Sequence, residues 1–414
     1  MNLRLFAIAL VFLSISCAKE PFEPAPVRIT ALPRALTAGE QRLIDADNRL
    51  AFKLLQLVTT ETSDTLPNLF ISPLSIAMAL GMTYNGAAGT TEEAMRSTLE
   101  LDSMTLDEVN DANRSLIALL RGLDPRVRFQ IANSIWYRQG FVVEPPFLDA
   151  TRTYFDARVE ALDFSAPDAA QTINDWIKAQ TQGLIPTVVP NPVPQDVLMY
   201  LINAIYFKGD WTQQFDKART LPRAFRLTDG MTVDVPTMTY ADQGNIRRKE
   251  TANALIVDLP YGGQAFSMTI VLPNEGTAVE DIVAALTPEQ WRDWTTGLDS
   301  ARAELFLPKF KLENNLTLKP TLQALGMAVA FSDAANFHRM TPAAVTIYDV
   351  LHRTYVDVNE EGTEAAAVTV VVVGPTCACG PEPIRIDRPF LFALRETLSG
   401  TILFMGVIRH PTSD

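Results

Sequence analysis

The chain of 414 residues contains little of what metal or disulfide chemistry requires, because it has only three cysteines and three histidines. These are Cys17, Cys377, Cys379, His338, His352 and His410. So few residues exclude a disulfide-stapled scaffold and leave too little for a Cys/His zinc cluster. The 35 basic residues are outnumbered by 48 acidic ones, a formal net charge of −13, so the cationic footprint of a nucleic-acid-binding protein is missing. We therefore expect no metal, no cofactor and no nucleic-acid partner.

Local catalytic signatures are missing as well. The sequence contains no HExxH, GxSxG, GxxxxGK or GxGxxG motif, and its three histidines define no general base. A hydrolase is therefore only the third hypothesis for function. An apolar content of 47% with 20% charged residues is enough for a large core, which excludes disorder as the main state.

The first 17 residues, MNLRLFAIALVFLSISC, have the layout of an export signal. One cation at Arg4 precedes an apolar run that is too short to span a bilayer comfortably, and small residues precede Cys17. This arrangement resembles a bacterial lipoprotein signal, in which the cysteine is lipidated, although Ser14 stands where such signals usually carry leucine. We expect an exported protein that Cys17 anchors to the cell envelope. An ordinary cleaved signal and secretion are the alternative. Residues 18–38 are proline-rich and predict an extended tether.

The rest of the chain, 39–414, shows no repeat or second linker, and we expect it to form one domain. Helical spacing predicts a helix over 39–60, Ser72 followed by Pro73 predicts the start of a second, and Thr90 with Glu93 predicts the capping box of a third. Stretches rich in β-branched and aromatic residues predict strands at 127–137, 197–211, 254–273, 304–312, 390–394 and 401–408. Helices followed by long strands indicate an α+β fold rather than repeated βαβ units.

Residues 360–379, EEGTEAAAVTVVVVGPTCAC, are the most informative segment. The β-branched run from Val368 to Val373 is typical of a strand buried on both faces. Its small lead-in residues and its Gly/Pro/Cys end instead favour an exposed loop. The segment is thus either a central strand or a conditional strand, exposed in one state and paired in another. In a strand, one side would carry Thr363, Ala365, Ala367, Thr369, Val371 and Val373.

At this point six blocks of the sequence together resemble the serpin family. They are NLFISPLSIAMAL (68–80), INDWIKAQTQGLI (173–185), LINAIYFKGDW (201–211), LPKFKLENNLTLKPTLQALG (307–326), EEGTEAAA, and the terminal DRPFLFALRE with TILFMGVIRHP. They cover nearly everything from about residue 40 to 411, in the family's order and spacing. The resemblance implies a serpin-like α+β fold. A fold of this kind would have a multi-helix N-terminal part, three β-sheets that include a large, five-stranded central sheet, and an exposed reactive loop at about 360–384.

The resemblance also implies a mechanism that needs no catalytic residue in the inhibitor. A serine protease attacks the loop and forms an acyl-enzyme, and the cleaved loop then inserts as a new middle strand and distorts the protease. The hinge that enters first would be Glu360, Glu361, Gly362, Thr363, Ala365, Ala366 and Ala367. A charged or bulky side chain at Thr363 or Ala365 would slow insertion. We expect the protein to be a monomer apart from its covalent complex with the protease.

Other positions that match the family's motifs would act structurally. Glu360 would pair with Lys309 above Trp211, where insertion begins. Asn203 and His352 would hydrogen-bond beneath the centre of the sheet, near Ser72 and Ser75, where the strands must part.

Counting from the hinge places the reactive bond at about Thr376–Cys377, whereas counting back from DRPF places it nearer Ala378. No Arg, Lys or large aromatic residue lies between Val368 and Cys379. An elastase-like or subtilisin-like target is therefore expected, and a papain-like cysteine protease is the alternative. Cys377 and Cys379 could also form a redox pair or half a metal site, but a disulfide across one residue is strained and two thiolates alone hold zinc weakly.

The second hypothesis for function is a non-inhibitory serpin that acts as a binding or chaperone module. Such members typically carry bulky, charged or proline residues in the hinge, whereas this chain has TEAAAVT. We therefore predict an irreversible inhibitor of serine endopeptidases.

Overall fold

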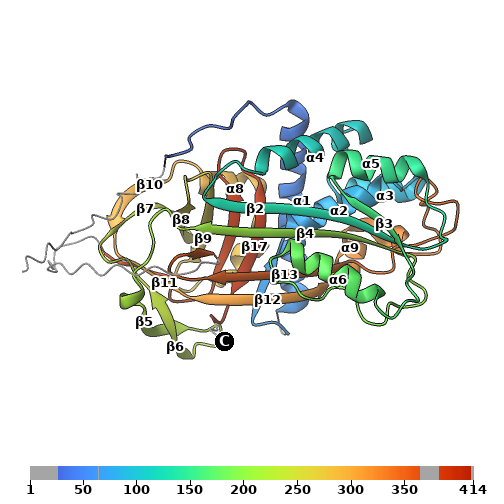
Figure 1. The fold of residues 1–414 in the computed structure, drawn as a ribbon. Helices are drawn as coiled ribbons and strands as arrows, with labels where there is room; N and C mark the ends of the chain where they lie inside the picture. Colours follow the sequence, from blue (N-terminus) through green and yellow to red (C-terminus); the bar gives the residue numbers. More distant parts are fainter. Residues whose placement is uncertain (1–26, 64, 364–381, 412–414) are drawn as a thin grey trace, which may run out of the picture.

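A computed structural model describes residues 27–63, 65–363 and 382–411. Within these residues the chain forms three β-sheets, and helices from its first half gather at one end of the molecule (Figure 1). The predicted α+β fold with three sheets is confirmed.

The N-terminal helices largely follow the predicted pattern. They are α1 (Ala38–Thr62), α2 (Pro73–Tyr84), α3 (Gly89–Thr98), α4 (Leu106–Leu120), α5 (Pro145–Phe155) and α6 (Ala169–Gln180). Ser72 caps α2, because its hydroxyl accepts a hydrogen bond from the amide of Ser75. The capping box predicted at Thr90 is wrong: α3 begins at Gly89, so Thr90 already lies inside the helix and Ala88 is the N-cap. The capping boxes that form begin at Thr37 and Thr105.

The central sheet has the strand order β12-β13-β14-β4-β2-β3. Its strands are β12 (Phe310–Thr317), β13 (Leu351–Val358), β14 (Gly362–Thr363), β4 (Met199–Asp210), β2 (Val127–Arg138) and β3 (Arg158–Leu162). The long strands run side by side across the molecule (Figure 1). The resemblance led us to expect five strands. The sixth is β14, which consists of only two hinge residues.

Helices cover both faces of this sheet, and the alternation of side chains along β4 decides which residue faces which helix. Ile202 packs with Ile173 and Ile177 of α6 in one apolar cluster. The next residue, Asn203, points the other way, where its side chain lies 3.8 Å from the sulfur of Met78 in α2. Figure 1 shows α6 lying across the sheet.

A second sheet, with the strand order β1-β17-β16-β9-β8-β7-β10, packs against the central sheet. Its strands are β1 (Asn68–Ile71), β17 (Ile402–Ile408), β16 (Phe390–Glu396), β9 (Phe266–Pro273), β8 (Ala254–Tyr261), β7 (Gly244–Glu250) and β10 (Asp299–Ala303). Aromatic pairs join the two sheets: the ring of Phe207 meets that of Tyr261 at 5.2 Å, and Phe310 meets Phe392 at 5.2 Å. The main hydrophobic core lies between them.

The third sheet has the order β15-β11-β6-β5 and lies where the predicted reactive loop rejoins the described chain. It consists of β15 (Ile384–Arg385), β11 (Leu305–Pro308), β6 (Thr232–Met238) and β5 (Leu221–Arg226). The strand predicted over 304–312 divides at Lys309 into β11 and β12, which belong to different sheets. Short helices α7 (Val279–Ala284), α8 (Pro288–Thr295) and α9 (Lys319–Leu322) complete the helical part.

Part of the segment predicted as a tether contacts the folded body. The amide of Ile29 donates to the carbonyl of Gly263 at 2.8 Å, and Arg34 pairs with the buried carboxylate of Glu40. Across the described ranges of the chain, no helix combines the length and apolar character needed to cross a membrane.

Candidate functional site

Two residues of the predicted hinge, Gly362 and Thr363, are seated in the central sheet. Gly362 pairs with Asp210 and Thr363 with Gly209, both on β4, while Thr363 also pairs with Val358 on β13. β14 therefore joins two strands that would otherwise be neighbours, and it does so at one end of the sheet only.

The backbone permits this seat because Gly362 has no side chain. A Cβ at this position would collide with the backbone of Gly209 and Asp210, and Gly209 is held in place by its pairing with Val127 on β2. Glycine is thus required here by close approach of two backbones.

Thr363 is held in the seat through its side chain, which is only 3% exposed. Its hydroxyl lies 2.7 Å from the hydroxyl of Tyr261, at the end of β8 in the second sheet. The Tyr261 ring stacks on Trp211 with centroids 4.4 Å apart, and burial raises the pKa of its hydroxyl, which therefore stays protonated. The hinge threonine consequently docks against a rigid aromatic pair.

The two glutamates before β14 are buried, and each one pairs with a lysine. Lys309 reaches the carboxylate of Glu360 at 2.9 Å, and Thr220 donates to the same carboxylate at 2.7 Å. Glu361 pairs with Lys217. Burial works to raise the pKa of Glu360, but the hydrogen bonds from Thr220 and Lys309 outweigh it and hold this pKa below its ordinary value.

Residues that follow β4 hold the same turn by hydrogen bonds to its backbone carbonyls. The indole Nε1 of Trp211 donates to the carbonyl of Asn359 at 2.9 Å, and the Trp211 amide donates to the carbonyl of Glu361 at 2.8 Å. The amide of Phe215 donates to the carbonyl of Glu360 at 2.9 Å. The point at which a strand would enter the sheet is therefore rigid.

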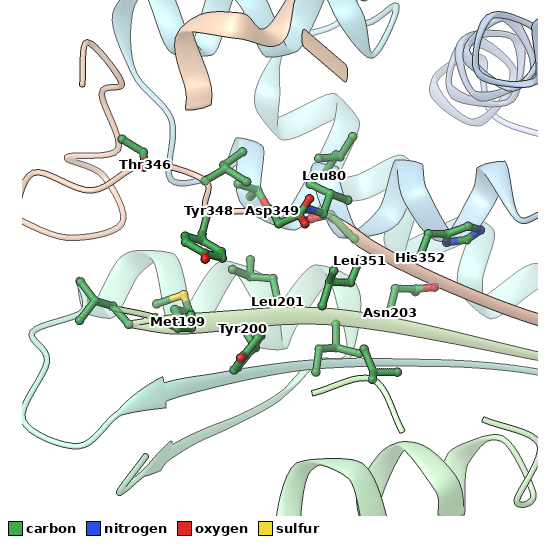
Figure 2. A pocket seen from close by; sticks show the side chains of 18 of the residues that line it. Leu80, Met199, Tyr200, Leu201, Asn203, Thr346, Tyr348, Asp349, Leu351 and His352 are labelled. Atoms are coloured by element: carbon green, nitrogen blue, oxygen red, sulfur yellow. Dashed lines mark hydrogen bonds between the residues drawn. The ribbon is translucent and has the colours of Figure 1, made fainter. Parts of the chain in front are cut away.

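Beyond β14 the described residues place no strand between β4 and β13, and we call this stretch the opening. Among the described residues, β4 and β13 are linked only through β14, with no direct pairing between them. A cavity of about 720 Å³ lies along this opening, lined by residues of β4, by the segment leading into β13 and by α2. Figure 2 shows Met199, Leu201, Tyr348 and Leu351 around it, with Asn203 and His352 at one end.

Polar groups lie beneath this opening near the start of α2. The Nε2 atom of His352 accepts a hydrogen bond from the amide of Ser72 at 2.9 Å, so the neutral ring carries its proton on Nδ1. Burial, with a smaller contribution from Arg353, lowers the pKa of His352 to about 4. The hydroxyl of Ser75 lies 3.5 Å from the carbonyl oxygen of Asn203.

The side chain of Asn203 is only half satisfied. Its amide nitrogen donates to the carboxamide of Asn133 at 2.6 Å, but its Oδ1 atom is buried and has no hydrogen-bond partner among the described residues. An unpartnered buried acceptor is costly, and this one lies at the cavity.

The structure thus brings the described hinge residues together with Lys309 and Trp211, and it places Asn203, His352, Ser72 and Ser75 beneath the opening. The remaining predicted positions lie outside the described residues and stay predictions: Cys17, Ala365, Ala366, Ala367, Thr376, Cys377 and Ala378.

Sequence reasoning missed Tyr261, Lys217 and Thr220. Tyr261 ends a predicted strand just before a Gly-Gly turn, and a bulky aromatic at such a position could have suggested a packing role. Lys217 and Thr220 belong to a short loop that meets the hinge from 144 and 140 residues away, a separation at which no local pattern signals contact.

Comparisons with known proteins agree with this geometry. The family model described as "Serpin (serine protease inhibitor)" matches residues 45–411. Iripin-8 of Ixodes ricinus is 35% identical over 388 residues, which cover 90% of this chain and 94% of the relative. The human leukocyte elastase inhibitor is 33% identical over 382 residues, which cover 90% of this chain and 100% of the relative.

Solved structures show the same fold. The native structure of the thermophilic serpin tengpin superposes with a TM-score of 0.80 at 27% identity, covering 94% of this chain and 97% of tengpin. Human thyroxine-binding globulin in complex with its hormone gives a TM-score of 0.80 at 28% identity, covering 91% of this chain and all of the globulin. With its hinge geometry, its three sheets and a family match over most of its length, the chain belongs to the serpin family, whose members are typically serine protease inhibitors.

Proposed function

We propose that this protein inhibits serine endopeptidases irreversibly, as a suicide substrate whose cleaved loop inserts between β4 and β13. The serine hydroxyl of the protease attacks the carbonyl carbon of the reactive bond, at about Thr376–Cys377 or nearer Ala378. The amine of the following residue leaves with a proton, and the loop stays joined to the protease as an ester. Insertion of the loop then carries the acylated protease along before water can hydrolyse the ester.

The register of β14 is the observation that carries this proposal. Thr363 lies opposite Gly209 on β4 and Val358 on β13. If both antiparallel pairings continue, Thr369 comes to lie between Asn203 and His352. Its hydroxyl could then donate to the unpartnered Oδ1 atom of Asn203.

The same register places the two inward-facing valines over the cavity. Val371 would lie opposite Leu201 and Val350, and Val373 opposite Met199 and Tyr348. All four of these opposing residues line the cavity. In this register, the loop threonine would meet the polar end of the cavity, and the two loop valines would meet its apolar lining.

The composition of the loop supports an elastase-like or subtilisin-like target, since no Arg, Lys or large aromatic residue lies between Val368 and Cys379 and residues 368–373 are all β-branched. The name of one relative, leukocyte elastase inhibitor, points the same way. A binding function is the second candidate, because thyroxine-binding globulin, which has this fold, is solved in complex with thyroxine. The two hinge residues Gly362 and Thr363 have small, uncharged side chains and already pair with β4. This arrangement favours inhibition.

The test is incubation of the full chain with pancreatic elastase and with subtilisin, followed by denaturing gel electrophoresis. We expect an SDS-resistant complex of inhibitor and protease. Thr363→Arg should abolish this complex while the loop is still cleaved, because a cation cannot enter the buried seat, and Thr363→Ser should retain it. Simple cleavage of the wild type by both enzymes, or a stable complex with Thr363→Arg, would contradict the proposal.

A further inference from the structure

The hydroxyl contact between Tyr261 and Thr363 has a role beyond packing. We propose that Tyr261 is a positioning residue that holds the hinge in the sheet before cleavage, and that it thereby sets the fraction of attacking protease that is trapped rather than released. This inference rests on the proposed function and names the residue that controls its efficiency.

Tyr261 is held independently of the hinge that it contacts. It belongs to β8 of the second sheet, its side chain is fully buried, and its ring is fixed between Trp211 at 4.4 Å and Phe207 at 5.2 Å. The ring lies against Gly209, where an added Cβ would come within 3.0 Å of it. The Tyr261 hydroxyl therefore occupies a fixed position, and the contact forms only when Thr363 is seated in the sheet.

The backbone around Tyr261 is also tied to the strand that receives the hinge. Tyr261 forms an isolated β-bridge with Trp211, and the amide of Gly262 donates to the carbonyl of Asp210 at 2.8 Å. Asp210 is the partner of Gly362 in β14. The end of β8 is thus joined directly to the end of β4, the strand on which the hinge pairs.

After acylation, insertion of the loop competes with hydrolysis of the acyl-enzyme, and a seated hinge favours insertion. Water hydrolyses the acyl-enzyme at a rate set by the protease, so the trapped fraction depends on how fast the loop inserts. A loop whose first two residues are already paired begins insertion without having to find its register. If the Tyr261 hydroxyl is removed, the buried hydroxyl of Thr363 loses its partner and the seated state becomes less favourable.

The variants that test this are Tyr261→Phe, Thr363→Val and the double variant, measured as the number of inhibitor molecules consumed per elastase or subtilisin molecule inactivated. Loss of one buried hydrogen bond should raise the ratio of cleaved to trapped inhibitor about two- to tenfold in each single variant. Because the double variant replaces both polar partners, it should recover toward the wild-type ratio. Tyr240→Phe is the matched control: this buried tyrosine stacks on Phe215 nearby, and no contact joins it to Thr363 among the described residues.

A second readout needs no protease. In the intact protein, hydrogen exchange of the Gly362 and Thr363 amides should be about two- to tenfold faster in Tyr261→Phe than in the wild type, and unchanged in Tyr240→Phe. Wild-type exchange and a wild-type trapping ratio in Tyr261→Phe would overturn the inference. If the wild type traps neither protease, the proposed function fails, while the exchange measurement still decides whether Tyr261 holds the hinge.

Discussion

At the scale of single residues, the point of insertion is marked by two buried carboxylates. Glu360 and Glu361 are 4% and 5% exposed, and each is compensated by a lysine from a different part of the chain. Removing one partner of a buried pair costs several kcal/mol, whereas the intact pair contributes little net stability. The main effect of these ion pairs is therefore to hold the residues before β14 in one position, and their contribution to the stability of the fold is small.

His352 should make the stability of the protein depend on pH. Its folded-state pKa of about 4 lies below the ordinary value of 6.5, so between these values the unfolded chain binds a proton that the folded protein does not. Stability is then complete above about pH 6.5 and falls as the pH drops toward 4, by about 3 kcal/mol in total. Protonation also removes the acceptor of the Ser72 amide.

We expect the apparent free energy of unfolding in urea to fall less between pH 7 and pH 5 in His352→Gln than in the wild type, by about 2 kcal/mol. Carboxylates titrate in both proteins, so the difference isolates the histidine. His338→Gln, which changes an exposed histidine, should keep the wild-type pH dependence. An equal loss of stability in wild type and His352→Gln would refute this role for His352.

At the scale of elements, the two-residue strand β14 shows how much depends on one glycine. An added methyl group at Gly362 would overlap the carbonyl of Gly209, which β4 holds in place through its pairing with β2. Gly362→Ala should therefore push the hinge out of the sheet. Limited proteolysis of the intact protein should then cut near residues 360–363 several-fold faster.

The control for this substitution is Gly230→Ala in the turn between β5 and β6. Its positive φ of 82° also strains an alanine, but an added Cβ meets nothing within 4 Å. This variant should lose some stability and keep the wild-type cleavage rate at the hinge. A Gly362→Ala protein with wild-type resistance to proteolysis would show that β14 does not depend on close backbone approach.

The sequence predicts these elements to different degrees. Apolar spacing and turn residues locate α1, α2, β2 and β4 to within a few residues, because each has a strong local period. The division of 304–312 between two sheets could not be predicted, because it depends on distant partners. β11 pairs with β6, about 70 residues earlier, and with β15, 79 residues later, whereas β12 pairs with β13, 34 to 48 residues later. The seat of Thr363 likewise depends on Tyr261, 102 residues distant.

At the scale of the whole molecule, the described residues leave the central sheet incomplete between β4 and β13. Its outer strands pair over long registers, such as Phe310–Thr317 with Leu351–Val358, while β4 and β13 meet only through β14 among the described residues. Beside the cavity, the facing edges of β4 and β13 can accept another strand. In the part of the chain that the structure describes, the central sheet thus has an unfilled position between β4 and β13, above a cavity of about 720 Å³.

Hydrogen exchange of β4 and β13 before and after cleavage of the loop tests the central claim most directly. A non-target protease that cuts the loop without being trapped would supply the cleaved protein, and mass spectrometry would follow the amides of residues 199–204 and 351–353, which line the cavity. If the loop fills the opening, exchange in both strands should slow by orders of magnitude after cleavage, while exchange in β16 and β17 stays as it was. Unchanged exchange in β4 and β13 after complete cleavage would contradict the account.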